Sequence, residues 1–451
     1  MHRFFFAEVS LVDWSKLPNL AAIALLTMAF FSVARYGRTS SSGVWLVGWL
    51  MVVLHFAAFL FLPVPGIASI ASALLGSAAL AWAGILFMWA SVPYRDRTSS
   101  RWMLASLLTS NTFYIVVVSI TPARHWLLTS AAILIGALPL AISLGNSRTF
   151  RHPLRWSLVL LNCLLSAFLL AVQNRHGIGA SLAMNALLFS IYFGCCIHFW
   201  YAYRRATAGA LITVLGFLAW ANVFTIGPAM LAFFPGFHAE SEVWNLPKYV
   251  VAVGMILLLL EDQIEHNKYL ALHDELTGLP NRRLFQDRLA NALERARRTG
   301  SQAALLLVDL DHFKQVNDTV GHHIGDELLK HVSRLFLARV RRSDTVARTG
   351  GDEFSVVLEE PISRTDAMLV ARTLTQLLEP PILLKGNTLH IGASVGLAVF
   401  PEDAADAEAL CIAADLRMYA SKRAARSRGE PATPAPLLAD PTPSTDQDSA
   451  L

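Results

Sequence analysis

Apolar stretches of about 20 residues with almost no charge recur along the first 260 positions of the chain and do not recur beyond them. A helix of that length crosses the hydrocarbon core of a bilayer, which is about 30 Å thick. Nine such stretches predict a multi-pass α-helical membrane domain over residues 1–260. The expected spans are 17–34, 44–62, 67–90, 102–120, 126–144, 156–172, 178–201, 208–233 and 246–260.

The pattern changes abruptly after Leu260. Residues 261–270 are mostly polar, and no Gly or Pro interrupts the chain before Gly278. The last span is therefore expected to continue as a connecting helix over residues 261–273. Leu257, Ile264 and Ala271 are seven residues apart, which is a coiled-coil spacing over only about two heptads. A dimer seam and a plain amphipathic connector both remain open.

Residues 274–428 alternate between strand-like and helix-like patterns, which predicts an α/β domain with a central sheet. Strands are expected over 303–309 and 389–400, and a hairpin over 345–358 that turns at Gly350 and Gly351. Helices are expected over 325–340, 363–378 and 407–423. The remaining segment, 429–451, is rich in Pro, Thr and Ala and is expected to be disordered.

The charge distribution separates the same two regions. Asp, Glu, Lys and Arg make up 16% of the whole chain, with a net charge of +4. They account for about 8% of residues 1–260, where the net charge is +10, and about 26% of the rest, where it is −6. A charged fraction near one quarter is normal for a soluble domain. The basic net charge arises in the membrane region, so it does not predict DNA binding.

Arginines in the loops between spans predict the orientation, because basic loops stay in the cytoplasm. One set of loops contains ten arginines: Arg35, Arg38, Arg95, Arg97, Arg101, Arg148, Arg151, Arg155, Arg204 and Arg205. The opposite side contains Arg3, Lys16, Arg124, Arg175 and Lys248, together with Glu240 and Glu242. This asymmetry predicts that the C-terminal domain lies in the cytoplasm. With eight spans, the charge pattern would not alternate.

Two histidines, His55 and His198, fall inside expected spans, where ionisable groups are costly and are often functional. Three roles of these histidines remain possible: a metal or haem ligand, a proton-sensing group, or a histidine hydrogen-bonded between packed helices. The four cysteines have no zinc or disulfide spacing and are expected to be reduced and structural.

Acidic side chains gather at the ends of the expected strands. Asp309 and Asp311 end the first strand, and Asp352 and Glu353 follow the two glycines of the hairpin. Crowded carboxylates repel one another unless a cation neutralises them, and oxygen ligands of this kind suit Mg²⁺. Gly350 and Gly351 allow backbone to approach a bulky ligand, and Lys314, Lys422 and Arg426 supply positive charge for a polyphosphate.

Several motifs in order resemble the GGDEF family of diguanylate cyclases. They are DELTGLPNRR at 274–283, VDLDHFK at 308–314, Asn317 with Asp318, GHHIGD at 321–326 and RTGGDEF at 348–354. The resemblance covers residues 270–428, about a third of the chain. One departure is Ala425-Arg426-Ser427, where the family usually has Gly-Arg-Asn; the arginine is kept.

The resemblance implies a palm-like, nucleotide-cyclase-like fold that condenses two GTP into cyclic di-GMP, with two Mg²⁺ ions, or Mn²⁺, at each active site. It implies that Asp309, the Leu310 carbonyl and Asp352 hold metal, and that Asp352, helped by Glu353, accepts the proton of the attacking 3′-hydroxyl. The implied substrate-binding residues are Lys314, Asn317, His322, Asp326, Gly350, Gly351, Lys422 and Arg426. Because one domain binds one GTP, a homodimer is expected.

Arg341 and Asp344 have the R-x-x-D spacing of the family's inhibitory product site and precede the hairpin as that site does. The resemblance implies feedback by cyclic di-GMP there; a helix-ending salt bridge is the plainer reading. Two other functions remain open. One is a non-catalytic receptor for cyclic di-GMP or GTP, and the other is a transporter regulated by its cytoplasmic domain. The retained acids argue against the first, and the scarcity of charge within the spans argues against the second.

Overall fold

The computed structural model describes residues 12–35, 40–91, 98–121, 124–145, 153–173, 179–203, 207–234, 241–360 and 362–427. The side chains of residues 40, 98, 99, 153, 241 and 424–427 are outside that description. So are ten charged residues of the predicted loops, Arg3, Arg38, Arg95, Arg97, Arg148, Arg151, Arg175, Arg204, Arg205 and Glu240, and the predicted disordered segment. The chain divides into two units, Met1–Glu265 and His266–Leu451.

Nine helices in the described part of the chain are long and apolar enough to cross a membrane, as the sequence predicts. They are α1 (Leu17–Ala34), α2 (Ser40–Leu60), α3 (Ile67–Ala90), α4 (Thr98–Ile120), α5 (His125–Leu144), α6 (Pro153–Val172), α7 (Gly179–Ala202), α8 (Ala208–Phe233) and α9 (Ser241–Leu272). A short 3-10 helix, η1 (Trp14–Lys16), precedes α1. As expected, the last helix continues past Leu260, and it ends at Leu272.

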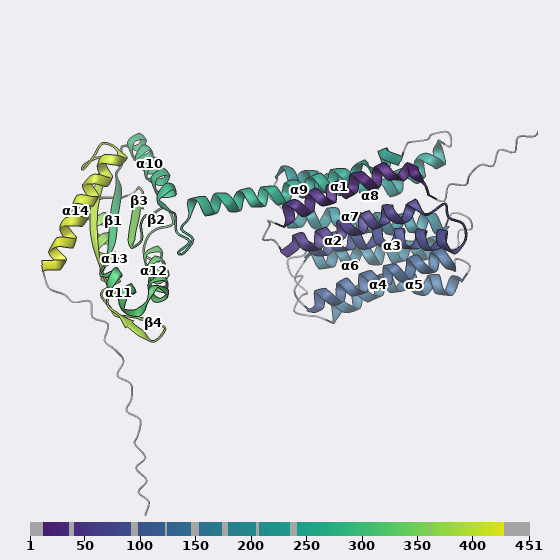
Figure 1. Ribbon diagram of the computed structural model, residues 1–451, viewed down its shortest axis with the longest axis horizontal. Coiled ribbons are helices and arrows are strands. Elements are labelled where there is room, and N and C mark those ends of the chain that lie inside the picture. Colours follow the sequence, from purple (N-terminus) through teal and green to yellow (C-terminus); the bar gives the residue numbers. More distant parts are fainter. Residues whose placement is uncertain are drawn as a thin grey trace, which may run out of the picture. The chain divides into compact units, whose positions relative to one another are not determined.

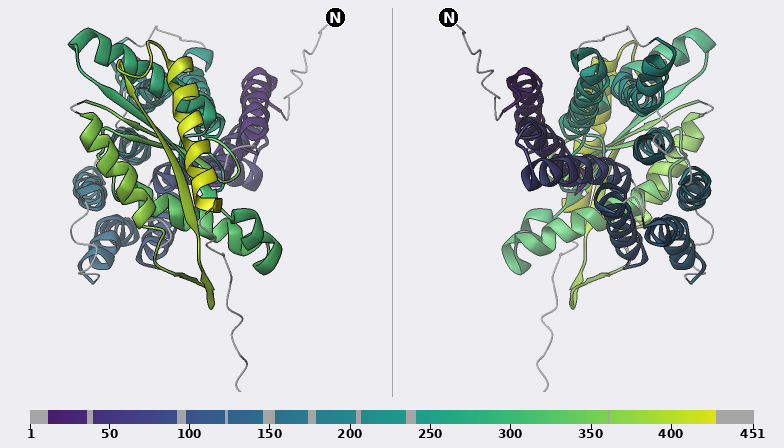
Figure 2. Two further views of the ribbon diagram at one scale, coloured as in Figure 1. Left: turned by 90° about the vertical axis from the view of Figure 1, so that its left-hand side faces the viewer. Right: turned by 90° about the vertical axis from the view of Figure 1, so that its right-hand side faces the viewer.

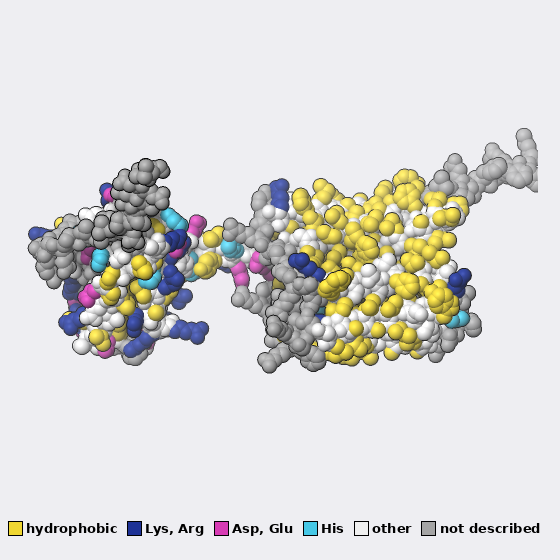
Figure 3. All heavy atoms as spheres, turned by 90° about the horizontal axis from the view of Figure 1, so that it is seen from below, with side chains coloured by type: hydrophobic (Ala, Val, Ile, Leu, Met, Phe, Trp, Pro, Cys, Tyr) yellow, Lys and Arg dark blue, Asp and Glu magenta, His cyan; other side chains and the backbone are white. Residues whose placement is uncertain are grey.

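The helices are apolar on their outer faces as well as at their contacts. Leu160, Leu215 and Trp200 are each at least 60% exposed, and Figure 3 shows hydrophobic side chains over the visible face of this unit. Such a surface is costly in water and favourable in lipid. Figures 1 and 2 show the helices lying side by side as a bundle. Its interior is rich in aromatic rings, with Tyr192 and Trp220 stacked 4.0 Å apart.

The C-terminal unit is built on one antiparallel sheet with the strand order β2-β3-β1-β6. The strands are β1 (Ala303–Asp311), β2 (Thr345–Arg348), β3 (Glu353–Leu358) and β6 (Gly392–Phe400). Helices α10 (Arg282–Thr299) and α14 (Ala407–Ser427) cover one face, and α12 (His322–Leu337) and α13 (Arg364–Gln376) cover the other (Figure 1). A short helix, α11 (Phe313–Val320), follows β1 directly.

The side chains of β1 alternate between these two layers. Leu306, Val308 and Leu310 belong to the core under α12 and α13, whereas Leu305 belongs to the core under α10 and α14. Because strand residues two apart share a face, this alternation places Asp309 and Asp311 on the α14 side of the sheet. The sequence therefore fixes the face on which the acids of β1 lie.

The predicted hairpin over 345–358 is confirmed by the pairing of β2 with β3. The strand predicted over 389–400 is wrong at its start, because β6 begins only at Gly392. Leu389 instead ends β5 (Asn387–Leu389), which pairs with β4 (Ile382–Leu384). Lys385 and Gly386 join those two strands with φ values of 47° and 83°, the conformation of a tight hairpin turn.

Candidate active site

The acidic end of β1 is where the sheet brings the predicted catalytic elements together. Asp309 pairs with Glu353 of β3 on one side and with Ser394 of β6 on the other. Residues directly opposite in antiparallel strands project to the same face, so these three side chains emerge together. Asp309 and Glu353 are 44 positions apart in the sequence, and the strand register brings them directly opposite each other.

Asp309 is 6% exposed and pairs with a lysine from the helix above it. The Lys422 Nζ of α14 lies 2.7 Å from Asp309 Oδ1. A buried carboxylate is costly unless a cation or several hydrogen bonds compensate it. The pair therefore joins a predicted metal ligand to a predicted phosphate ligand.

Asp311 is the second acid on this face. Ser394 Oγ donates a 2.8 Å hydrogen bond to its Oδ1. Burial raises the pKa of Asp311, and the negative charge of Asp309 raises it further, whereas the hydrogen bond from Ser394 opposes the rise. Asp311 was predicted only as a member of the acidic cluster, without a role of its own. The hydrogen bond between Asp311 and Ser394 across β1 and β6 assigns both to the edge of the site.

The turn that joins β2 to β3 is held by backbone contacts. Thr349 N and Gly350 N donate to the Glu353 carbonyl at 3.0 and 3.3 Å, and Leu310 N donates to the Asp352 carbonyl at 3.2 Å. A Cβ on Gly350 would lie 2.5 Å from Glu353 Oε2 and 3.1 Å from Glu353 Cβ, so a side chain there would displace the Glu353 carboxylate. The sequence pattern predicts Glu353 within the hairpin turn, but in the structure Glu353 is the first residue of β3. Within the described residues, neither the Asp352 nor the Glu353 carboxylate has a hydrogen bond or ion pair.

An arginine anchors this turn to the start of the domain. Arg348 donates to the Gly351 carbonyl at 2.7 Å from NH2, and its NH1 lies 3.0 and 3.1 Å from the two carboxylate oxygens of Asp274. Burial opposes ionisation of Asp274, but hydrogen bonds from Thr277 and from Arg348 hold its pKa below the usual value. Both residues stood in the recognised motifs, yet only the structure shows that they contact each other.

The segment that contains Asp274 begins where α9 ends. Asn281 donates from Nδ2 to the Ala271 carbonyl and from its backbone N to the Leu272 carbonyl, both at 2.9 Å. Arg348 N donates to the Pro280 carbonyl at 2.9 Å. The last carbonyls of α9 are thus connected through Asn281 and Pro280 to Arg348.

The predicted guanine-reading residues come from α11 and α12. Gly325 lies so close to Asn317 that a Cβ would be 1.9 Å from Asn317 Oδ1. That oxygen is buried and has no hydrogen-bond partner in the described part of the chain. Asp326 follows Gly325 and is exposed, as are Lys314 and His322. An acceptor buried without a donor is costly, which makes Asn317 a candidate for binding an N–H group of a ligand.

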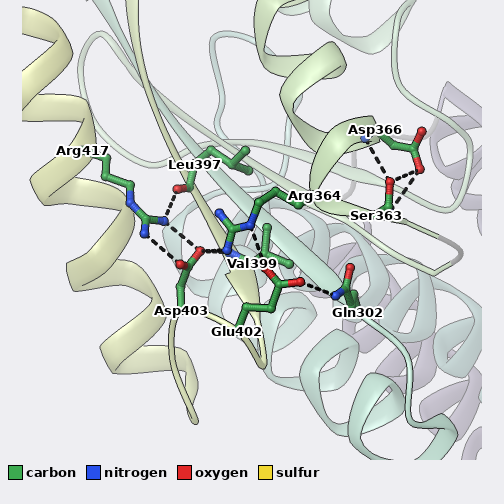
Figure 4. A network of polar contacts seen from close by, with 9 residues as sticks. All are labelled: Gln302, Ser363, Arg364, Asp366, Leu397, Val399, Glu402, Asp403 and Arg417. Atoms are coloured by element: carbon green, nitrogen blue, oxygen red, sulfur yellow. Dashed lines mark hydrogen bonds and ion pairs between the residues drawn. The ribbon is translucent and has the colours of Figure 1, made fainter.

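Helix α14 carries the predicted phosphate-binding residues Lys422 and Arg426. A Cβ on Gly396 of β6 would lie 1.9 Å from the Ala414 carbonyl, so the helix packs directly on the strand. Arg417 donates to Asp403, and Arg364 of α13 lies 2.8 Å from the same carboxylate, which ties both helices to the end of β6 (Figure 4). The predicted residue Arg426 lies in α14, but its side chain is outside the described residues.

Arg341 and Asp344 lie in a turn between α12 and β2. Asp344 Oδ2 accepts a 2.8 Å hydrogen bond from the backbone N of Arg341, and Asp344 Oδ1 accepts one of 3.2 Å from Glu359 N. Because α12 already ends at Leu337, the tetrapeptide does not end a helix. Arg341 is exposed.

The donor chemistry of the site fits a hard divalent cation. Asp309, Asp352 and the Leu310 carbonyl offer only oxygen atoms, and two of these donors are carboxylates, which Mg²⁺ prefers. Among the described residues, no three His, Cys, Asp or Glu side chains lie together so that they could hold a metal ion. The predicted set has two carboxylates and one carbonyl, so substrate phosphates and water would complete the coordination.

Inside the helical unit, both histidines are hydrogen-bonded to backbone. His55 Nδ1 lies 2.9 Å from the Gly76 carbonyl, and His198 Nδ1 lies 2.9 Å from the Gly194 carbonyl. These contacts favour the packing interpretation over a ligand role. Lys248 falls inside the expected span 246–260, although the charge pattern counted it with the loop charges; it lies within α9 and is 7% exposed.

Comparison with known proteins identifies the C-terminal unit. Residues 271–428 match the family described as "Diguanylate cyclase, GGDEF domain". The chain is 39% identical over 193 residues to the bifunctional diguanylate cyclase/cyclic di-GMP phosphodiesterase MucR of Pseudomonas aeruginosa, which covers 40% of this chain and 28% of MucR. It is 40% identical over 168 residues to the diguanylate cyclase TpbB of the same organism, which covers 37% of this chain and 39% of TpbB.

Solved GGDEF domains also align with this part of the chain. A structure comprising only the GGDEF domain of TpbB is 41% identical, with a TM-score of 0.33, and covers 34% of this chain and 89% of that one. The coiled coil and GGDEF domain of DgcB from Caulobacter crescentus, in complex with cyclic di-GMP, is 26% identical, with a TM-score of 0.38, and covers 40% and 95%. This chain thus spans less than two fifths of the full length of these two curated relatives. Residues 271–428 are a GGDEF domain of the diguanylate cyclase family, with a palm-like fold, and they follow a unit in which the described residues form nine long apolar helices.

Proposed function

We propose that the protein is a membrane-embedded diguanylate cyclase that condenses two GTP molecules into cyclic di-GMP. The observation that supports this most strongly is the strand register that places Asp309 opposite Glu353. Next to this pair, Leu310 N donates a hydrogen bond to the Asp352 carbonyl. The acids therefore converge from two strands on the same edge of the sheet. A receptor that only binds nucleotide would not need this set of carboxylates.

Each residue then has a role in the reaction. A 3′-hydroxyl oxygen of one GTP attacks the α-phosphorus of the other, a pyrophosphate leaves, and the exchange is repeated in the opposite direction to close the ring. Asp352, helped by Glu353, accepts the hydroxyl proton, which a nearby carboxylate with no ion pair of its own can do. Lys422 and Arg426 bind the β- and γ-phosphates, and Lys422 moves from Asp309 to do so.

Divalent metal fits the oxygen donors, and Asp309, the Leu310 carbonyl and Asp352 would hold two Mg²⁺ ions, or Mn²⁺. When bound, such ions stabilise the negative charge that develops on the phosphate oxygens. The chain's own basic side chains add to that stabilisation. Burial is the main cause of the raised pKa of Asp311, and repulsion from Asp309 adds to it. Mg²⁺ would relieve that repulsion.

Asn317 and Asp326 would read the guanine base. The Asn317 Oδ1 atom is buried and lacks a donor, and guanine offers N–H groups on its Watson–Crick edge. Asp326 can accept a second N–H from the same edge, while Lys314 and His322 lie exposed near the nucleotide. Gly350 and Gly351 would let the turn approach the substrate.

One domain would bind one GTP, so two domains would face each other in a homodimer. Arg341 and Asp344 would bind cyclic di-GMP as an inhibitor, since the arginine is exposed and Asp344 is fixed by two backbone hydrogen bonds. The arginine-rich side of the helical unit would face the cytoplasm of a bacterial cell, with the helices in the inner membrane.

The deciding experiment is incubation of the full-length protein in detergent with GTP and Mg²⁺, followed by chromatography of the nucleotides. We expect cyclic di-GMP and two pyrophosphates per product molecule, and at least a 100-fold loss of rate in Asp352→Ala, because a general base contributes about 10²- to 10⁴-fold. Equal rates for the variant and the parent would contradict the assigned chemistry.

Feedback is tested separately. Arg341→Ala should keep turning over at cyclic di-GMP concentrations that stall the parent, while its initial rate without product stays within about twofold. The neighbouring Arg342→Ala is the matched control and should stall as the parent does. If Arg341→Ala stalls at the same concentration, the product site lies elsewhere.

A further inference from the structure

Helix α9 carries a buried lysine, Lys248, toward its N-terminal end, whereas Glu261 lies further along the same helix. Lys248 follows the start of α9 by seven residues, or about 10 Å at 1.5 Å per residue. Its side chain is buried, as is that of Asn245 one helical turn earlier. A charged group in this position is costly in a membrane protein and marks a functional site by default.

The contacts of Lys248 leave its ammonium group incompletely paired. Its Nζ bonds to Asn245 Oδ1, and it lies 4.9 Å from the ring centre of Phe56 and 6.0 Å from that of Trp220. No carboxylate in the described part of the chain pairs with it. An ammonium has three N–H donors, so two are left without a polar acceptor.

The neighbouring polar groups also favour an added acceptor. The Trp220 Nε1 atom is buried and, among the described residues, has no hydrogen-bond partner. His55, whose ring lies 5.2 Å from that of Phe56, donates from Nδ1 to the Gly76 carbonyl, and its Nε2 atom makes no hydrogen bond with Lys248. One indole N–H and two ammonium N–H groups of these neighbouring side chains therefore have no acceptor among the described residues.

We infer that this place binds an organic anion with an apolar body, through a carboxylate or phosphate head. The head would accept from Lys248 and from Trp220 Nε1, which supplies the charge and the acceptors that the chain lacks there. The rings of Phe56 and Trp220 would contact the apolar body. A free carboxylic acid and an anionic phospholipid share this chemistry, so the experiment distinguishes the two sources.

Cation–π contacts alone are the competing explanation. They attract the ammonium but accept no hydrogen bond from it, and they leave the Trp220 N–H without a partner. In that case Lys248 would be purely structural. Replacing a buried charge by a neutral group of similar size would then be neutral or stabilising, with or without a ligand.

The test uses the full-length protein in phosphatidylcholine nanodiscs with two probes. The first is decanoate added from solution, with a chain-brominated decanoate to quench tryptophan fluorescence on contact. The second is phosphatidylglycerol incorporated into the nanodisc. The readouts are the midpoint of thermal unfolding and the quenching, and the variants are Lys248→Gln, Lys248→Arg and Trp220→Phe. Arg124→Gln, which removes an exposed cation at the same end of the bundle, is the matched control.

We expect a probe to raise the unfolding midpoint of the parent, of Lys248→Arg and of the control, and to bind Lys248→Gln about 10- to 100-fold more weakly. A response to decanoate identifies a soluble ligand, and a response to phosphatidylglycerol alone identifies a lipid; both support the site. A midpoint unmoved by either probe overturns the proposal, and so does equal affinity in Lys248→Gln. If Lys248→Gln does not fold, undiminished quenching in Trp220→Phe overturns it.

Discussion

Replacing Asp274 by Asn tests whether the start of the domain controls the catalytic turn. The Asp274 carboxylate accepts hydrogen bonds from Thr277 N and Oγ1 at 2.9 and 2.6 Å, and from Arg348 NH1. Asparagine keeps one acceptor for Thr277 but presents an uncharged amide to the guanidinium. Arg348 would then lose its orientation while it still donates to the Gly351 carbonyl.

The magnitude follows from the number and exposure of these contacts. A hydrogen bond to a charged group contributes about 1.5–3 kcal/mol when buried, and this pair is only partly buried, with side-chain exposures of 13% and 23%. The free energy of unfolding should therefore fall by about 1–2 kcal/mol. A displaced turn moves Asp352 and Glu353, and an error of about 1 Å can reduce a rate about 100-fold. We expect kcat to fall at least tenfold.

Two measurements test this reasoning. Urea unfolding of residues 262–428, which contain their own two-layer core, gives the free energy, and cyclic di-GMP formation by the full-length protein gives kcat. Glu402→Gln is the matched control, because it removes a carboxylate that forms an ion pair with Arg364. Glu402 follows the end of β6, which is at the far end of the sheet from Asp309. This substitution should lower the stability by less than about 1 kcal/mol and leave kcat unchanged.

The pH dependence of the Asp274 contact has a definite sign. Since its pKa is lowered in the folded protein, the contact stabilises the fold fully above the unfolded value near pH 4. That stabilisation is lost as the pH falls below it. The stability difference between the parent and Asp274→Asn should thus shrink in acid. If the variant loses stability but keeps the kcat of the control, Arg348 only supports the fold and does not position the turn.

Two further predictions concern residues that position the site. Gly325→Ala adds about 1 kcal/mol of helix propensity but places a methyl group 1.9 Å from Asn317 Oδ1. We therefore expect KM for GTP to rise at least tenfold while the unfolding temperature changes little. An unchanged KM would contradict a role for Asn317. Hydrogen bonds from Arg417 hold the pKa of Asp403 far below its usual range, and Asp403→Asn removes that charged partner. The free energy of unfolding, measured by urea titration, should fall by about 2–3 kcal/mol at neutral pH. The difference between the parent and the variant should shrink below about pH 4.

The sequence predicted the elements well where hydrophobic periodicity decides them. The nine spans and the hairpin follow from long apolar runs and from the paired glycines at 350 and 351. Helices α10 and α11 were not predicted. Eight of the 18 residues at 282–299 are charged, and two of the five buried side chains of α10 are the alanines Ala292 and Ala296, so its apolar face is weak. Helix α11 has only eight residues and two buried anchors.

The active-site acids were predictable as residue types, but their convergence was not. A strand pattern indicates which face a residue takes, yet the register of β1 against β3 and β6 depends on tertiary packing. For that reason the pairing of Asp309 with Glu353, and the contact of Ser394 with Asp311, could not be predicted. Lys248 was missed for another reason: a lysine near the end of an apolar run is usually a loop charge, and only packing shows that it points inward.

Helix α9 is the element through which the helical unit would influence the GGDEF domain. Its Gly254 packs so closely on α8 that a Cβ would lie 2.7 Å from the backbone N of Thr213, and its Glu261 Oε1 accepts a 3.0 Å hydrogen bond from Gly209 N at the start of α8. Such contacts with backbone leave little room for sliding, so any movement of α9 would have to carry α8 with it or break the bond to Glu261. The same helix carries Lys248 near its start, and it ends at the carbonyls of Ala271 and Leu272 that bind Asn281. An anion bound at Lys248 would therefore act on α9, whose last turn binds Asn281 in the segment that contacts Arg348. If anion binding changes the cyclase rate, that change should disappear in Asn281→Ala, while anion binding itself is retained.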